Sequence, residues 1–516
     1  MSFRISSLSN LPHLARSFNG VVQNEPQPTI EVPKHWVSDW FELFLKKIAL
    51  NKQGPTLTTR WLLLAANCLY NSYQFITEGK QPLDTQYWTS SEKGQTSSDI
   101  SYMESWIELS CQYFFPKIMK DYTKNGATNY FSISPLTDEE VNILVNSHKP
   151  LVNVNVNSLN SLKVLIDSYL AARDDDGWKT TTVFNGTLPN GDAFISADNS
   201  IDQDLSTLTD VNKWTPLKLG GALKKYLTPE WGTNNQGILD SSTFTDLLTK
   251  TDQLFPTSSQ YESEMKETAN VTSNLTDEQK TIAEFWAGGP GTVTPPGMWV
   301  VFLDIVIRSN NIKLVNEIKN YTILCSGLYQ SSICAWRIKR DKLQARPIQK
   351  IRQYLYNQSI SQSWDTNANN DKGQFWLPYQ ELNFVTPPFP DFVSGHSTFS
   401  SSSAKLFCYL LGTDMINLQN PVINNDILQY LCPTLNSSSR TNFSLNNFFI
   451  FPNTSTVESG VPETSINLNW VCWTEMARSS GKSRIYGGIH IESSNQGGLY
   501  LGSMIGDKIW NLLKNI

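Results

Sequence analysis

Three short polar signatures in the second half of the chain constrain its fold more than any other feature. Together they contain three cations, a hydroxyl, a backbone amide and two imidazoles, which suit the binding of a tetrahedral oxyanion and acid-base chemistry on it. The signatures are Lys339 with Arg346-Pro347, Ser394-Gly395-His396, and Ser483-Arg484 with His490. A fold that uses them together must bring three distant segments to one point.

Only five histidines occur in the chain, and two of them lie inside these signatures. His13, His35 and His148 have no comparable polar neighbours in the sequence. We therefore expect these three to be surface or helix-cap residues.

The length of 516 residues exceeds the size at which a single core stops growing, so two or three substructures are expected. Hydrophobic residues make up 40% of the chain and 16 tryptophans occur in it, so its composition is that of a globular protein. The net charge of −6 offers no basic excess for a phosphate backbone, which argues against nucleic-acid binding.

Helical periodicity dominates the sequence and predicts a mainly α fold. Apolar residues recur at three- and four-residue steps in 58–75 and in 159–172. The polar stretch 257–274 is the best boundary candidate, and Thr276 with Gln279 forms a capping-box pattern just after it. We predict an N-terminal extension (1–45), a helical domain with a long irregular connection (46–260), and a second helical bundle (275–516) that carries the oxyanion site.

Targeting and redox signals point to a soluble, reducing location. The apolar runs are too short to span a bilayer, and the N-terminus lacks the apolar core of a secretory signal. Seven scattered cysteines without metal-ligand spacing are expected to be mostly free, buried thiols. A cytoplasmic protein is expected, and its many aromatic residues would allow a homodimer.

The first signature predicts a helix break. Lys339 and Arg346 lie almost two helical turns apart, but Pro347 disfavours the α conformation at Arg346 and suits the first turn of a new helix through Tyr354. Arg346 would then point inward from the break. Taken alone, both residues could equally be solvated surface charges.

The second signature predicts a helix N-terminus. Ser394-Gly395-His396 precedes a helical run from Ser397 to Leu411 that Gly412 closes. Unpaired amides and the helix dipole favour an anion at such an end. The alternative is that Ser394 merely caps the helix and His396 is an ordinary first-turn histidine.

The third signature predicts a bend. Arg484 and His490 would project from different faces of one continuous helix, but Gly487-Gly488 lies between them. A bend there would let both side chains converge on one ion.

The order and spacing of the three signatures resemble those of the vanadium-dependent haloperoxidases and the related acid-phosphatase superfamily. The resemblance implies that His490 is the axial ligand of vanadium, or the nucleophile of a phosphatase. It also implies that His396 is the acid-base residue and that Lys339 polarises bound peroxide. The residues implied to hold the equatorial oxygens of the cofactor vanadate are Lys339, Arg346, Ser394, Gly395 and Arg484.

Context favours the oxidase. The chain is longer than the soluble phosphatases of this superfamily, and Trp336 and Phe389 occupy positions that resemble the aromatic halide-site residues of chloroperoxidases. The resemblance therefore implies hydrogen peroxide and a halide as substrates, with an organic acceptor as a further partner. A phosphomonoesterase and a non-catalytic oxyanion-binding protein stay open as alternatives.

Two positions depart from the family pattern. Val393 stands where a proline normally precedes Ser-Gly-His, and Gly288 stands where an aspartate partner of the second arginine is often found. Asp304 is a weaker candidate for that partner.

Overall fold

The chain folds into a mainly helical protein, as predicted. The computed structural model describes residues 35–119, 134–148, 151–174, 176, 178, 199–200, 210–219, 222–224, 226–233, 237–360, 362, 364, 372–418, 425–432, 445 and 448–516. The helices are α1 (Trp36–Leu50), α2 (Pro55–Phe75), α3 (Ile100–Ile118), α4 (Asp138–Ser147), α5 (Val156–Asp174), α6 (Ser241–Asp252), α7 (Ser258–Ser273), α8 (Asp277–Phe285), α9 (Thr294–Ser309), α10 (Leu314–Lys342), α11 (Pro347–Tyr354), α12 (Gly395–Leu411), α13 (Asn425–Leu431), α14 (Trp473–Tyr486) and α15 (Glu492–Leu513).

Strands are few and short among the described residues. β1 (Asn199–Ser200) pairs in parallel with β2 (Leu217–Leu219), which pairs antiparallel with β3 (Ala222–Leu223). β4 (Phe448–Ile450) and β5 (Ile466–Leu468) form a separate antiparallel pair. Neither sheet forms the core, which is built from helices.

The helices begin and end where local sequence signals place them. α2 starts at Pro55, in the first turn where the missing amide hydrogen of proline costs nothing. Thr276 and Gln279 form the predicted capping box of α8. The predicted helices 58–75 and 159–172 are confirmed as parts of α2 and α5.

The long helix α10 and the helix α12 form the centre of the structure. α12 packs against α10, α14 and α15, while α2 packs along α10. α12 and α15 approach so closely that a side chain on Gly502 would meet the backbone oxygen of Thr398 at 2.3 Å. The small residues of both helices therefore permit this contact.

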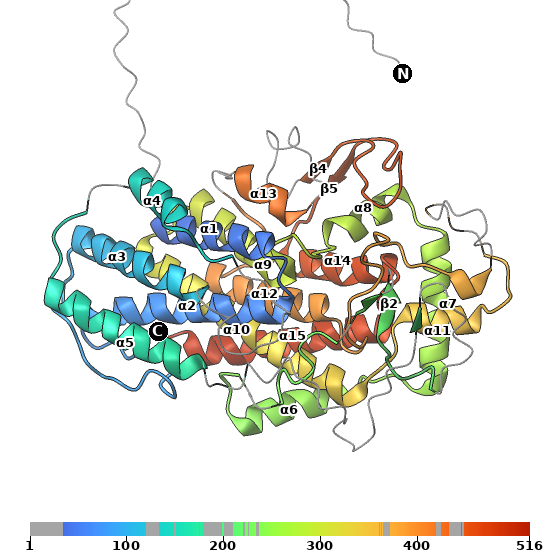
Figure 1. Ribbon diagram of the computed structural model, residues 1–516, viewed down its shortest axis with the longest axis horizontal. Helices are drawn as coiled ribbons and strands as arrows, with labels where there is room; N and C mark the ends of the chain where they lie inside the picture. The colour runs from blue at the N-terminus through green and yellow to red at the C-terminus, as the bar shows by residue number, and fades with distance from the viewer. Residues whose placement is uncertain are drawn as a thin grey trace, which may run out of the picture. The chain divides into compact units, whose positions relative to one another are not determined.

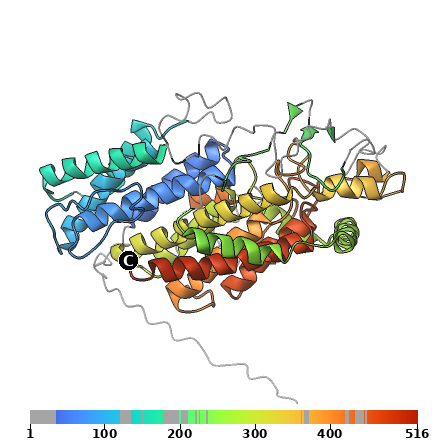
Figure 2. The ribbon, with the colours of Figure 1, turned by 90° about the horizontal axis from the view of Figure 1, so that it is seen from below.

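The N-terminal helices pack directly on the C-terminal ones. Helices α1, α2, α3 and α5 gather on one side of the central helices, in blue to teal, with α1 and α2 against α9 and α10 (Figures 1 and 2). Residues 35–516 form one compact unit, and the polar stretch chosen as a boundary is helix α7, packed on α11 and α14. The division at 261–274 stays a prediction.

Two further expectations can be compared with the structure. All seven cysteines are free, and five of them are buried. In the part of the chain that the structure describes, no helix is long and apolar enough to cross a bilayer.

Candidate oxyanion site

The first signature forms the predicted break. α10 ends at Lys342, Leu343 adopts a left-handed conformation with φ of 49°, and Arg346 is the extended residue before α11. Both signature cations are buried rather than solvated, with Lys339 0% and Arg346 1% exposed. The surface-charge alternative is therefore wrong.

Each cation of this signature is held by backbone oxygens. Lys339 Nζ donates to the carbonyls of Pro390 at 2.8 Å and Asp391 at 2.7 Å. Arg346 donates from Nε to Phe389 O and from Nη1 to Ile489 O, each at 2.7 Å. Its Nη2 is buried and has no hydrogen-bond partner, so one donor of the guanidinium is available to a ligand.

The second signature forms the N-terminus of α12. Ser394 caps the helix, because its hydroxyl oxygen accepts from the amide of Ser397 at 3.3 Å. His396 Nε2 lies 2.9 Å from the carbonyl of Trp286. A carbonyl only accepts, so Nε2 carries a proton, and in the neutral ring Nδ1 is the atom that can accept one.

The third signature contains the predicted bend. α14 ends at Tyr486, and Gly488 has a φ of 67°, a conformation that glycine adopts without strain. Arg484 then points back toward α8, where Nη1 donates to Trp286 O at 3.1 Å and Ala283 O at 3.5 Å. Its Nε is buried without a partner.

The signatures meet at His490. Its Nε2 lies 3.0 Å from Arg346 Nη1, and its Nδ1 contacts the carboxylate of Asp391. An arginine nitrogen only donates, so Nε2 accepts and the ring proton lies on Nδ1, facing Asp391. This arrangement directs the Nε2 lone pair into the group of cations.

Asp391 is the functional residue that sequence reasoning missed. It is 0% exposed, and its backbone oxygen also accepts from Lys339, so it links the first and third signatures. The sequence did contain a signal for it. Asp391 lies only three residues before Ser394, so a fold that brings Ser394 and His490 to one site also brings Asp391 near the His490 ring. Its pairing with His490 depends on the tertiary fold.

The site carries an excess of buried positive charge, which favours the binding of an anion. Burial lowers the pKa of Arg346 to about 10, and burial with the nearby Arg346 lowers that of Arg484 to about 9. Burial and then the cations Arg346, Lys339 and Arg484 hold the pKa of His490 well below its usual range. Burial raises the pKa of Asp391 to about 7 despite Arg346 and Lys339. The site thus holds three buried cations and one carboxylate, which interacts with Arg346 and Lys339 but not with Arg484, and a bound anion would relieve the repulsion between the cations.

A cavity of about 510 Å³ opens onto the site. His490, Arg484, His396 and Gly395 line one part of it, together with the aromatic residues Trp336 and Phe389. Lys339, Arg346 and Ser394 are buried and are not among the residues that line this cavity. Three of the predicted ligands, Gly395, Arg484 and His490, therefore line the cavity wall.

The two halide-site candidates lie next to the cations. The rings of Trp336 and Phe389 are 4.8 Å apart, and Lys339 Nζ lies 5.2 Å from the Phe389 ring. Arg346 also lies against this ring, at 4.9 Å. The face of a phenyl ring attracts cations, so Phe389 stabilises the buried charges that surround it.

The proposed link between Asp304 and Arg484 is wrong. Asp304 instead pairs with Arg308, one turn along α9, at 2.8 Å. Within the described residues no carboxylate pairs with Arg484, which is held by backbone oxygens alone. Gly288, at the position where an aspartate was expected, has a φ of 57° and lines the cavity.

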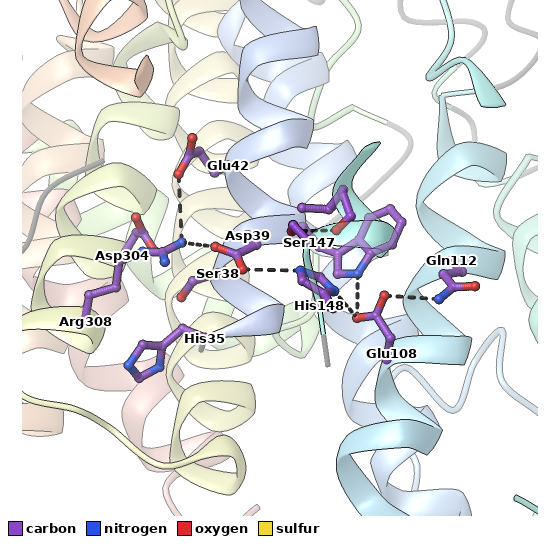
Figure 3. Close-up of polar contacts among 12 residues, drawn as sticks. His35, Ser38, Asp39, Glu42, Glu108, Gln112, Ser147, His148, Asp304 and Arg308 are labelled. Carbon is purple, nitrogen blue, oxygen red and sulfur yellow. Dashed lines mark hydrogen bonds and ion pairs between the residues drawn. The ribbon is translucent and has the colours of Figure 1, made fainter. Parts of the chain in front are cut away.

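His35 and His148 are helix caps, as expected, but neither lies on the surface. Each is buried beside carboxylates: His35 Nδ1 lies 3.5 Å from Glu317, and His148 lies between Asp39 and Glu108 (Figure 3). His13 falls outside the described residues. The two described histidines therefore match the helix-cap part of the expectation and not its surface part.

Comparisons with known proteins agree with this geometry. The family model described as the VCPO second helical-bundle domain matches residues 319–516, a segment that contains every predicted ligand. The resemblance to the vanadium haloperoxidase family is confirmed. A comparison with curated proteins found no match.

Solved structures of vanadium haloperoxidases share the fold over most of the chain. A holo-type bacterial vanadium-dependent chloroperoxidase is 14% identical, with a TM-score of 0.62 over 90% of this chain and 94% of that one. A bacterial vanadium-dependent iodoperoxidase is 16% identical, with a TM-score of 0.59 over 93% and 97%. At 14% and 16% identity these matches show a shared fold alone. Because they cover 90% and 93% of this chain, the shared fold includes its N-terminal helices.

Proposed function

We propose that the protein is a vanadate-dependent haloperoxidase, which uses hydrogen peroxide to oxidise a halide to a hypohalous-acid equivalent. The observation that carries the proposal is the convergence of three buried cations and two neutral imidazoles around His490 Nε2, beside a cavity. The likeness to vanadium-dependent chloroperoxidase and iodoperoxidase structures supports it.

The residues present fit a tetrahedral oxyanion such as vanadate. Arg346 Nη2 and Arg484 Nε are buried donors without partners, which a bound anion would satisfy. Lys339, Arg346, Arg484 and the N-terminus of α12 at Ser394 and Gly395 would hold its oxygens, and His490 Nε2 would hold the metal. Bound vanadate would supply a Lewis acid that activates peroxide toward a halide.

The chain's own groups have distinct tasks in this proposal. Asp391 holds the His490 proton on Nδ1 and so keeps Nε2 available as a ligand. His396, with its pKa well below the usual value because of burial and Arg484, is neutral and can take a proton from peroxide at Nδ1. Trp336 and Phe389 exclude water from the cation side of the cavity.

A phosphomonoesterase is the second candidate, and the Asp391–His490 pair favours it specifically. A carboxylate that orients a neutral imidazole also prepares a nucleophile, which could attack a phosphoryl group through Nε2. The two candidates use the same residues, so an assay must separate them.

The test is a paired assay on one preparation. Protein incubated with vanadate is assayed with peroxide and chloride, bromide or iodide on an activated phenol, and untreated protein is assayed on nitrophenyl phosphate. We expect halogenation that needs vanadate and disappears in His490→Ala. Phosphatase turnover inhibited by vanadate, without halogenation, would select the second candidate. Tight vanadate binding with neither activity would select a non-catalytic binding protein.

A further inference from the structure

A second cluster of buried charges surrounds His148, at the C-terminal end of α4. Its ring stacks on Trp36 of α1, with centroids 5.4 Å apart and planes inclined by 13°. Nε2 lies 3.3 Å from Asp39 of α1, and Nδ1 lies 3.1 Å from Glu108 of α3 (Figure 3). Because both nitrogens face carboxylates, the arrangement suits the doubly protonated, cationic ring.

The other charged groups near His148 do not replace its charge. On α1 and α9, Asp39 also pairs with Arg308 at 2.7 Å. On α3, Glu108 accepts from Trp40 Nε1 at 3.0 Å and from Gln112 Nε2 at 3.1 Å, which are neutral donors. Further charged or titratable groups near the pair are Glu42, Cys111, Asp304 and His35, and Glu317 of the adjacent helix α10. Within the described part of the chain, His148 is therefore the positive partner of Glu108.

α4 lies on the surface of the protein, where Val141, Leu144 and Val145 pack partly buried against the core. None of its ten residues is buried, and Ile143 is 66% exposed. Leu136, just before the helix, and His148, just after it, are the buried residues of the described segment 134–148. A segment with so few fully buried residues has low local stability, and the charge on His148 adds to its attachment.

The same segment holds the edge of the candidate active-site cavity. Glu140 of α4 accepts from Lys47 Nζ at 2.8 and 2.9 Å. The side chain of Asn51 pairs with the backbone of Ser134, donating to its oxygen at 3.0 Å and accepting from its amide at 2.6 Å. Asn51 belongs to the turn between α1 and α2, whose residues 50–54 line the cavity.

We propose that residues 134–148 form a strap, fastened by His148 between Asp39 and Glu108, that fixes the turn 50–54 at the edge of the cavity. Undocking of the strap would release Asn51 and Lys47 and let this turn move. The inference concerns access to the cavity and does not depend on which reaction occurs there. It would be a means of regulating entry from the N-terminal half of the chain.

The strap should respond to pH. Burial opposes the charge on His148, but Asp39 and Glu108 outweigh it and raise its pKa to about 9. This value lies above the ordinary value of 6.5, so the attachment is fully present below pH 6.5 and is lost as pH rises through about 9. Acidification fastens the strap, and alkali releases it.

Hydrogen exchange of the full-length protein, followed by mass spectrometry from pH 7 to pH 10 and corrected for intrinsic rates, tests the proposal. We expect protection of residues 134–148 and 50–54 to fall together, by about tenfold or more, while α10 and α12 keep theirs. In His148→Gln, low protection of both segments should already be present at pH 7 and change little with pH.

Two variants serve as controls. His35→Gln alters a buried histidine beside Glu317 that does not contact α4, so it should keep the wild-type pH profile. Glu140→Gln retains the capping box but loses the ion pair with Lys47, so protection should fall at 50–54 while the His148 end keeps its pH response. A wild-type pH profile in His148→Gln, or loss of protection in the strap with none at 50–54, would overturn the proposal. Should His148→Gln not fold, the wild-type profile and Glu140→Gln decide in the same way.

Discussion

The two buried histidine clusters of this protein have opposite charge balance. The cluster around His148 and Asp304 contains at least as many carboxylates as cations. Its cations, Arg308 and His148, have raised pKa values. The cluster around His490 contains three cations and one carboxylate, and the pKa values of Lys339, Arg346 and Arg484 are lowered. The first cluster is complete by itself and stabilises the fold. The second lacks negative charge, which is the property of a site that binds an anion.

The largest effect is expected from His490→Ala. His490→Ala removes the imidazole whose Nε2 lone pair faces Arg346, so halide oxidation should fall on the order of 10³-fold or more. Steady-state assays of vanadate-treated protein measure this. Retention of full activity would remove His490 from the catalytic site.

Two arginine substitutions compare the clusters directly. Arg308→Met leaves Asp304 buried without its cation, and we expect it to cost about 3–5 kcal/mol of unfolding free energy. Arg484→Met removes a cation that pairs with no carboxylate among the described residues, so the stability of the vanadate-free protein should change little. Vanadate affinity should fall by about 10²-fold instead.

Urea denaturation and vanadate titration of both variants provide the measurements. Equal loss of stability in the two variants would show that Arg484 is a structural residue like Arg308. The contrast between the clusters would then be wrong.

Asp391→Asn should reduce vanadate affinity or activity by about 10–100-fold. An amide keeps the size of the side chain but no longer fixes the His490 proton on Nδ1 as a carboxylate does. The pH profile of activity separates this role from a packing role, because only loss of the carboxylate shifts the pH dependence of His490. Asp391→Glu is the matched control that keeps the charge.

The pH dependence of stability should show the sign of the His148 shift. Its folded-state pKa of about 9 lies above the ordinary value, so wild-type protein should lose about 1–2 kcal/mol of unfolding free energy between pH 6.5 and 9. Denaturation curves of wild type and His148→Gln at several pH values measure the difference. Parallel curves for the two proteins would assign the loss to another group.

The smallest effect is expected at the aromatic residues. Phe389→Leu keeps the backbone oxygen that Arg346 contacts but removes a ring that lies against two cations, which is worth about 1 kcal/mol. Because about 1 kcal/mol corresponds to about fivefold in rate, turnover with bromide should fall by about that factor. Unchanged turnover would mean that Phe389 is core packing alone.

Much of the local structure could be predicted from the sequence. The break at Arg346, the cap at Ser394 and the bend at Gly488 all follow from the preferences of Pro, Ser and Gly, which act over a few neighbouring residues. The signature set also identified the residues that meet around His490. These features are local, or follow from the resemblance to a family.

Pairings between distant segments were decided by the tertiary structure. Asp391 meets His490 across 99 positions, Asp304 pairs with Arg308 rather than Arg484, and His148 lies between two acids from other helices. Residue type and spacing do not determine which helix faces bury one another, and the balance between burial and the neighbouring charges sets the sign of each pKa shift. The sequence by itself therefore determined which groups are available for an oxyanion site and where each helix begins. Only the packing of α10, α12, α14 and the loop before α12 decided which buried cations have a carboxylate partner and which are left to bind an anion. The reason is that Coulomb interactions depend on distance in space and not along the chain.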